Sequence, residues 1–157
     1  MNELWDVQLQ KWRYQSEYLE QWRTMEEQLG KEMDAFIAPI TPTAAVRHNQ
    51  FKYYGYASAI NLLDFTSVVV PVTFADKNVD KKQADYKPLS KIDEAVQAEC
   101  RCHPSIIMIR CLECSDDPEA YHGAPVAVQI VGRRLSEERT MAIAEEIGKL
   151  LGNEITP

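Results

Sequence analysis

Four cysteines with close spacing are the most obvious chemical groups in this sequence. They are Cys100, Cys102, Cys111 and Cys114, with His103 and Pro104 directly after the first pair. Two cysteine pairs on either side of a short apolar segment can approach the tetrahedral geometry of a zinc site. The spacing of Cys111 and Cys114 is typical of a zinc knuckle or a redox dithiol. The first pair is tighter than a usual ligand pair, so no metal ligand is assigned. A small zinc-stabilised module and a regulatory disulfide stay open as alternatives.

The segment around these cysteines differs in character from the sequence on both sides. Ser105-Ile-Ile-Met-Ile109 is an apolar, β-prone stretch inside a polar surface region. Such a stretch promotes edge pairing and aggregation. A third interpretation is therefore that residues 100–115 are an irregular insertion, of the kind that translation of a short unspliced intron produces. A comparison of the spliced transcript with the genomic DNA tests this interpretation.

Serine and histidine give no recognisable catalytic pattern. A serine nucleophile needs a turn that presents its hydroxyl beside backbone amide donors and a base. The sequence has no Gly-Gly and no Ser-Ser pair, and its serines all lie outside glycine-rich turns: Ser16, Ser58, Ser67, Ser90, Ser105, Ser115 and Ser136. His122 precedes Gly123, and without a positioned serine or aspartate both it and His48 are better explained as surface-loop residues. We therefore predict no catalytic residue, no cofactor site and no metal ligand.

Neighbouring acidic residues do not form an acid–base pair either. Examples are Glu26-Glu27, Asp116-Asp117 and Glu137-Glu138. On a helix, adjacent side chains diverge by about 100°. These residues are therefore interpreted as solvated surface.

Length and composition indicate one globular domain. The chain has 157 residues, of which 45% are hydrophobic and 26% charged, and these values suit a protein with a buried core. The net charge of −7 argues against a nucleic-acid partner, because phosphates attract a basic surface. The sequence has no run of 18 apolar residues, so we expect no membrane span, and residues 1–6 lack the pattern of a secretory signal. We expect a cytoplasmic protein with reduced cysteines.

One long helix is predicted over residues 3–31, and it carries all the tryptophans of the chain. Its apolar stripe has helical spacing and consists of Trp5, Leu9, Trp12, Leu19, Trp22 and Leu29. Gly30 is a typical helix stop. Aromatic stripes mostly pack inside domains, so we expect a core helix. The alternative is a partner-binding helix, since tryptophan is enriched at interfaces.

The rest of the chain alternates strands and helices. Strands are predicted at 35–38, at 67–70 with a possible continuation to Phe74 beyond Pro71, and at 126–131. A helix over 51–63 joins the first two strands, so these should be parallel with a right-handed crossover. A short helix is predicted over 88–97, with Ser90 as its N-cap and Asp93 and Glu94 in its first turn. The last helix is predicted over 136–151. Ser136 is the expected N-cap of the last helix, Met141, Ala144, Ile147 and Leu151 its apolar stripe, and Gly152 its end.

Three segments in this order resemble an amidase-signature hydrolase. They are Asp34-Ala-Phe-Ile-Ala-Pro-Ile-Thr-Pro-Thr43, Asn61-Leu-Leu-Asp-Phe-Thr-Ser-Val-Val-Val-Pro-Val72 and Gly123-Ala-Pro-Val-Ala-Val-Gln-Ile-Val-Gly-Arg-Arg134. The chain is most similar to the carboxy-terminal part of the fungal acetamidase-like branch, and the resemblance covers about residues 1–99 and 116–152. It implies an α/β fold: a partial α/β/α sandwich with a mixed sheet of about three strands flanked by helices. The strands from Ser67 and from Val126 would pair as antiparallel neighbours.

The resemblance also implies an activity that this sequence alone does not complete. The family hydrolyses carbon–nitrogen bonds in linear amides with a serine nucleophile, a second serine after a cis peptide bond, and a lysine base. Those residues lie in the preceding part of the fold, and no position of this sequence matches them. We therefore expect residues 1–157 to form a single partial amidase domain that is inactive alone, with a small amide substrate only in the full-length parent. The alternative is a non-catalytic interaction module that pairs with itself, as a homo-oligomer, or with a complementary amidase half.

Overall fold

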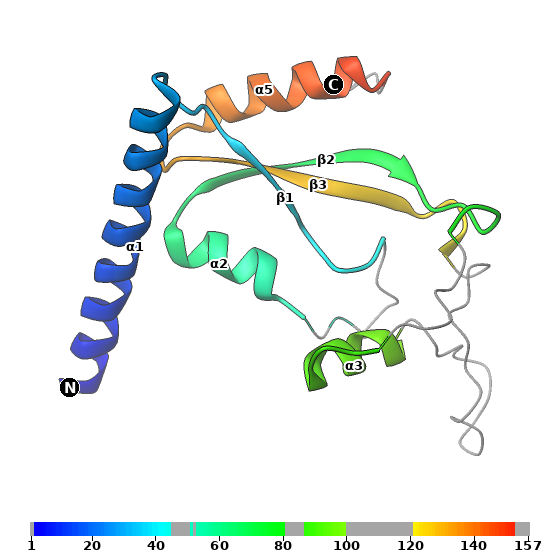
Figure 1. Cartoon of the computed structure of the whole chain (residues 1–157), viewed down its shortest axis with the longest axis horizontal. Coiled ribbons are helices and arrows are strands. Elements are labelled where there is room, and N and C mark those ends of the chain that lie inside the picture. Colours follow the sequence, from blue (N-terminus) through cyan, green and yellow to red (C-terminus); the bar gives the residue numbers. More distant parts are fainter. Residues whose placement is uncertain (1, 45–50, 52, 81–86, 100–120, 153–157) are drawn as a thin grey trace. The chain divides into compact units, whose positions relative to one another are not determined.

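A computed structural model describes residues 2–44, 51, 53–80, 87–99 and 121–152 of the chain. The described elements, in chain order, are α1 (Asn2–Leu29), β1 (Phe36–Pro39), α2 (Gly55–Leu63), β2 (Thr66–Phe74), α3 (Lys91–Glu99), β3 (Pro125–Gly132) and α5 (Glu137–Leu150) (Figure 1). They divide into two compact units. Unit 1 holds residues 1–38, 55–70 and 128–157, and unit 2 holds residues 39–54 and 71–127. Some predictions concern residues outside these ranges: the cysteine cluster, the insertion at 100–115 and two histidines (Cys100, Cys102, Cys111, Cys114, His103 and His48).

The three strands form one sheet in the order β1-β3-β2. β2 and β3 are antiparallel: the amide of Ala75 donates to the carbonyl of Ala124 and the amide of Gly123 to the carbonyl of Ala75, both at 2.9 Å. β1 runs in the same direction as β2, and β3 lies between them in the opposite direction (Figure 1). The α/β class and the antiparallel pairing of the strands from Ser67 and Val126 are confirmed. The strands joined through α2 are parallel, as predicted, but they are not neighbours.

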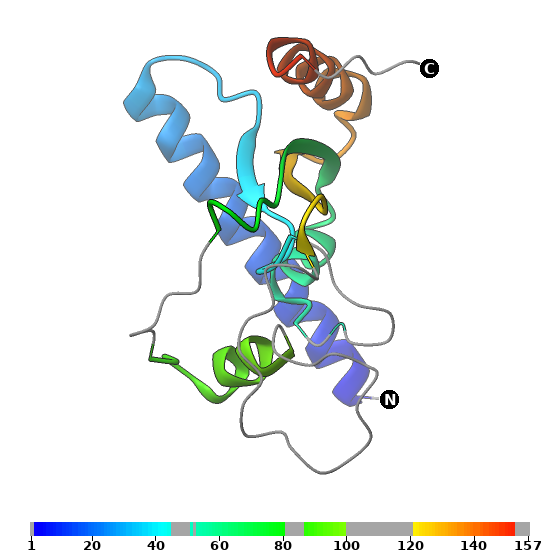
Figure 2. The same ribbon diagram turned by 90° about the vertical axis from the view of Figure 1, so that its right-hand side faces the viewer.

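Unit 1 has its hydrophobic core between the sheet and α5. Val70, Ile130 and Ala144 are buried together, and partly buried apolar side chains pack around them: Ala35, Val68, Val128, Ile143 and Ile147. Alternate residues of a strand face opposite sides of the sheet. Val131 therefore points to the other side, where Ile60 and Leu63 of α2 are also buried. Figures 1 and 2 show α5 and α2 on opposite sides of the strands, which is the helix–sheet–helix layering expected of a sandwich.

The carboxy-terminal half of α1 is fixed to unit 1 through aromatic contacts. Trp22 is only 2% exposed, and its ring lies 5.7 Å from the rings of both Phe36 and Phe65. Tyr18 meets Phe65 edge-on at 5.6 Å. The predicted stop at Gly30 is confirmed, because this residue has a φ of 65° that favours glycine.

The prediction of a core helix is wrong for two of the three tryptophans. Trp5 is 70% exposed and Trp12 is 63% exposed. Helical spacing places side chains on one stripe, but it does not determine how much of the helix length has a packing partner. The core interpretation holds for Trp22 only.

Several element boundaries differ from the predictions. α2 begins at Gly55 instead of residue 51, and Asp64 after it has a φ of 59°. The possible continuation of β2 through Pro71 to Phe74 is confirmed. A proline is tolerated there because β2 is an outer strand of the described sheet, where a missing amide breaks no pairing. The cap of α3 is confirmed, since Ser90 Oγ accepts a hydrogen bond from the amide of Asp93 at 3.1 Å.

The last helix needs two corrections. Ser136 stands at the N-cap position, but its hydroxyl donates to the carbonyl of Arg133 and makes no cap hydrogen bond. Met141 and Leu151 are 54% and 45% exposed, so they do not form the buried stripe. The buried side of α5 is instead formed by Thr140, Ile143, Ala144, Ile147 and Gly148. Among the described helices, none combines the length and the apolar character needed to cross a bilayer.

Candidate functional site

Four of the five serines within the described ranges make structural contacts. Ser16 Oγ donates to the carbonyl of Trp12 at 2.9 Å, one helical turn earlier. Ser67 Oγ donates to Oε1 of the buried Gln129 at 3.0 Å across the β2–β3 pair. Together with the capping contact of Ser90 and the turn contact of Ser136, these bonds hold backbone and strands in place. None of the partners in these four contacts is a lysine or a histidine, the bases that would activate a hydroxyl.

The proline-rich loop after β1 belongs to unit 2. Pro39 ends the strand, and Thr41 donates its hydroxyl hydrogen bond to the carbonyl of Thr43. The Thr43 hydroxyl oxygen is buried, and within the described structure it has no hydrogen-bond partner. A buried polar atom without a partner is destabilising by about 1–3 kcal/mol. The loop therefore keeps one hydroxyl available for a group outside the described residues.

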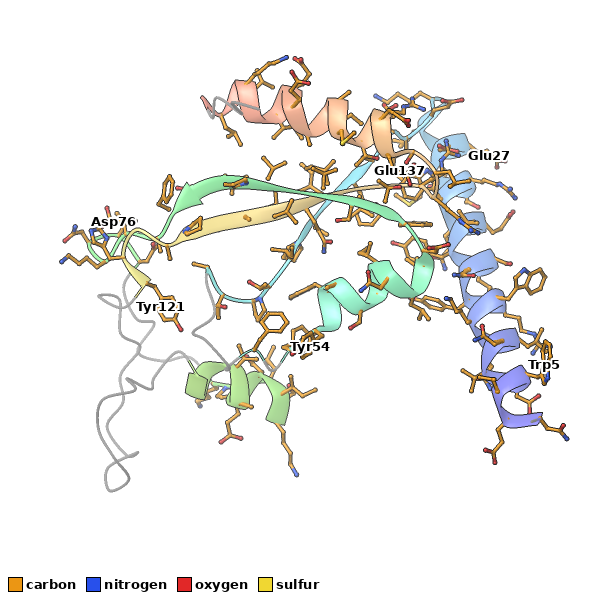
Figure 3. The ribbon with its side chains drawn as sticks, turned by 180° about the vertical axis from the view of Figure 1, so that it is seen from behind. Trp5, Glu27, Tyr54, Asp76, Tyr121 and Glu137 are labelled. Carbon is orange, nitrogen blue, oxygen red and sulfur yellow. The ribbon has the colours of Figure 1, made fainter. Side chains whose placement is uncertain are left out.

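A histidine and an aspartate meet where β2 ends and β3 begins, also in unit 2. The Nδ1 atom of His122 lies 3.9 Å from Oδ1 of Asp76, and both side chains are about half exposed. The amide of Asn78 donates to the Asp76 carboxylate at 2.9 Å, and this bond is the main reason why the pKa of Asp76 lies below its usual value. Figure 3 shows Asp76 and Tyr121 at this end of the strands. Sequence reasoning missed Asp76 as a partner of His122, because the two residues meet only through strand pairing.

The His122–Asp76 pair is suited to holding the turn. A carboxylate beside a histidine can orient the imidazole for proton transfer, but catalysis also needs a nucleophile within hydrogen-bond reach. Serine is absent from residues 75–80 and 121–125. The surface-loop interpretation of His122 therefore remains the simpler one.

A hollow of about 350 Å³ lies in unit 1, beside the end of α1. Its walls are mostly apolar and are lined by Leu29, Lys31, Glu32, Met33, Asp34, Ala35, Phe36, Ile37, Ile130, Ile143 and Ile147. Arg139 of α5 forms ion pairs with Asp34 and, at 3.7 Å, with Glu32. The lining contains no serine, cysteine or histidine, so the hollow can accommodate an apolar group and has no side chain suited to nucleophilic attack.

Glu26 connects three segments of unit 1. Its Oε1 atom accepts hydrogen bonds from Trp22 Nε1 at 3.1 Å and from the amide of Met33 at 3.0 Å. Arg133, which follows β3, places a guanidinium nitrogen 3.9 Å from the same oxygen and its charge 5.9 Å from the Trp22 ring. The Met33 amide is the largest cause of a lowered Glu26 pKa, and the Trp22 hydrogen bond and the Arg133 and Arg139 charges contribute. This carboxylate fixes the end of α1 to the sheet.

Among the residues with described positions, no group of three or more His, Cys, Asp or Glu side chains is arranged to hold a metal ion. The cysteines on which a zinc site or a disulfide depends lie outside those residues, so both hypotheses stay predictions. The prediction that the sequence carries no catalytic residue likewise stays a prediction.

Comparison with known proteins identifies the family. A sequence model of the family named Amidase matches residues 1–141. The chain is 69% identical over 157 residues to an acetamidase of Emericella nidulans, covering 100% of this chain and 26% of that protein. It is 64% identical over 153 residues to an acetamidase of Aspergillus oryzae, covering 98% of this chain and 25% of that protein.

A more distant relative and a solved structure agree with this result. A putative amidase of Schizosaccharomyces pombe is 32% identical over 119 residues, which are 76% of this chain and 19% of that protein. The structure of a fatty acid amide hydrolase has the same fold, with a TM-score of 0.70, 23% identity, and coverage of 94% of this chain and 23% of that chain. The chain spans about a quarter of the length of the two acetamidases that it matches. On this evidence, the chain belongs to the amidase family.

Proposed function

We propose that this chain is the carboxy-terminal scaffold of an acetamidase-type enzyme, and that the whole enzyme hydrolyses the carbon–nitrogen bond of small linear amides such as acetamide. The observation that carries the proposal is the 69% identity to the Emericella nidulans acetamidase, which extends over all 157 residues. The nucleophile, the relay serine and the lysine base belong to the part of the enzyme that this sequence does not contain.

The contacts described above fit a supporting role. Amide hydrolysis requires the nucleophile, the base and the oxyanion donors to be held in precise geometry. The α5–sheet core, the Glu26 contacts and the Ser67–Gln129 hydrogen bond make a stable base from which loops can be positioned. The loop with the unpartnered Thr43 hydroxyl is the described segment best suited to contact the rest of the enzyme or its substrate.

A chimeric enzyme tests this proposal. The matching quarter of the Emericella nidulans acetamidase is replaced by this chain, and ammonia release from acetamide is measured. We expect the chimera to hydrolyse acetamide and to be inhibited by a serine-reactive phosphonate. The isolated chain is assayed in parallel and should release no ammonia.

Two results would contradict the proposal. The first is a chimera that folds cooperatively but does not hydrolyse acetamide or another small amide, because the segment would then not be an equivalent scaffold. The second is phosphonate-sensitive turnover by the isolated chain, because a nucleophile and its base would then lie within these residues.

A further inference from the structure

The amino-terminal half of α1 stands apart from the core of unit 1. The helix has 28 residues, so it is about 42 Å long. Its contacts to α2 and the strands begin at Gln15, whose Nε2 atom donates to the carbonyl of Leu62 at 2.7 Å, and continue through Tyr18 and Trp22. Every residue from Asn2 to Gln10 is exposed. More than one helical turn of apolar surface is therefore left without a packing partner in the described structure.

Three exposed residues of this half of α1 form a continuous stripe, which we call the Trp5 stripe: Trp5, Leu9 and Trp12. They are 70%, 46% and 63% exposed. At about 100° per residue, Leu9 and Trp12 lie within about 40° of Trp5 around the helix. Trp22, which is packed in the core, lies about 100° away from Trp5 by the same count. Figure 3 shows Trp5 on the side of α1 that faces away from α2.

Exposure of this stripe is energetically unfavourable. An indole ring buries a large apolar area when it packs, and full burial of a large apolar side chain stabilises by about 1.5–3 kcal/mol. A helical segment of fewer than about 12–15 residues without tertiary packing is only marginally stable in water, and the part of α1 before Gln15 is of that size. A surface with two tryptophans and a leucine on one helix face has the composition of an interface hot spot.

We propose that the Trp5 stripe is the surface against which the rest of the amidase polypeptide packs. The inference rests on the proposed function. The occupant follows from length: the chain covers 26% of the Emericella nidulans acetamidase, so three quarters of that polypeptide is available to cover the stripe. In the fatty acid amide hydrolase structure, the matching segment is likewise only 23% of the chain. No feature of the described residues points to a second copy as the occupant.

Residue-resolved oxidation tests the proposal. Hydroxyl-radical footprinting with mass spectrometry is applied to the isolated chain and to the chimeric acetamidase described above. Trp5 and Trp12 should oxidise readily in the isolated chain and several-fold more slowly in the chimera. Trp22, at 2% exposed, is the internal standard and should react slowly in both.

A stability comparison gives an independent result. The double variant Trp5→Ser/Trp12→Ser should lower the Tm of the chimera and leave the Tm of the isolated chain unchanged. Met25→Ser is the matched control, because Met25 is also exposed on α1, at 48%, but lies on another side of the helix. If the chimera does not fold, this chain is tagged and co-expressed with the remaining acetamidase sequence as a separate polypeptide. The tagged chain should retain that polypeptide in a pull-down. Retention should be lost in the double variant and kept in Met25→Ser.

Distinct outcomes would overturn the proposal. Equal oxidation of Trp5 and Trp12 in the chain and in an active chimera would show that the stripe is not covered, while the amidase function would stand. Protection of both tryptophans in the isolated chain, with a dimer mass by light scattering, would assign the stripe to a second copy. Retention that survives the double variant would place the docking surface elsewhere.

Discussion

Gly132 at the end of β3 is the position where a single methyl group should be most disruptive. A Cβ atom at this position would lie closer than 3.0 Å to the Thr140 hydroxyl oxygen and 2.7 Å from Ser136 Oγ. Thr140 is only 1% exposed, and its hydroxyl already donates to the carbonyl of Ser136 at 2.7 Å. The clash therefore falls on a side chain that has neither free space nor a free hydrogen bond.

The expected cost of Gly132→Ala follows from these contacts. Overpacking of a filled site destabilises a protein by about 1–3 kcal/mol. If Thr140 moves away to relieve the clash, its buried hydroxyl loses its acceptor, which has a similar cost of about 1–3 kcal/mol. We expect a loss of about 2 kcal/mol, which corresponds to a decrease in Tm of roughly 4–8 °C for a chain of this size.

A double-mutant cycle identifies the cause. Urea unfolding is measured for Gly132→Ala, Thr140→Ala and the double variant. Since Thr140→Ala removes the clashing hydroxyl, the double variant should be more stable than the sum of the single losses predicts. Gly123→Ala is the control: Gly123 has a φ of 79° and no atom within 4 Å of an added Cβ, so Thr140→Ala should not rescue it. An unchanged stability of Gly132→Ala, or equal rescue of both glycine variants, would refute the packing argument.

Two further predictions concern α1. Trp22→Ala should destabilise the isolated chain by about 3–5 kcal/mol because it removes a buried ring, whereas Trp5→Ala should change its stability by less than about 0.5 kcal/mol, and thermal unfolding of both variants measures the difference. The folded-state pKa of Glu26 is lowered, so its ionised form stabilises the fold above its ordinary pKa of 4.5, and that contribution is lost as the pH falls from 4.5 through the lowered value. Glu26→Gln should therefore flatten the pH dependence of the free energy of unfolding in that window, with the exposed Glu27→Gln as the control. A wild-type slope in Glu26→Gln would show that Glu26 is not coupled to folding.

Local chemistry explains why parts of the fold were predictable. The end of α1 at Gly30 and the cap of α3 at Ser90 depend on one residue and its near neighbours. The antiparallel pairing of the strands from Ser67 and Val126 came from the amidase resemblance, and the structure confirms it. The continuation of β2 to Phe74 was predicted as possible, and Pro71 is tolerated within it because β2 is an outer strand of the described sheet. The start of α2 at Gly55 was not predicted.

The candidate site was harder to predict because its residues come together only through the packing of segments that are distant in the sequence. The His122–Asp76 contact joins a residue just after β2 to a residue just before β3, and the hollow beside α1 forms from three separate segments. Neither has a spacing that can be recognised along the chain. The expectation that no serine is a nucleophile rests on the absence of a glycine-rich turn around the serines in the sequence, and it stays a prediction.

The tryptophans of α1 show that the two interpretations of an aromatic stripe are compatible within one helix. Trp22 packs against Phe36 and Phe65 and stabilises unit 1, whereas Trp5 and Trp12 lie beyond the point where Gln15 begins the contacts with α2. Trp5 and Trp22 share a side-chain type, but they lie about 100° apart around the helix and at different points along it. Burial therefore depends on which face and which part of α1 the sheet and α2 cover. A short helical segment that extends past its own core is only marginally stable unless another surface packs against its apolar stripe. Under the proposed function, the rest of the acetamidase polypeptide supplies that surface, and we therefore expect the folding of the scaffold to be coupled to the assembly of the active site.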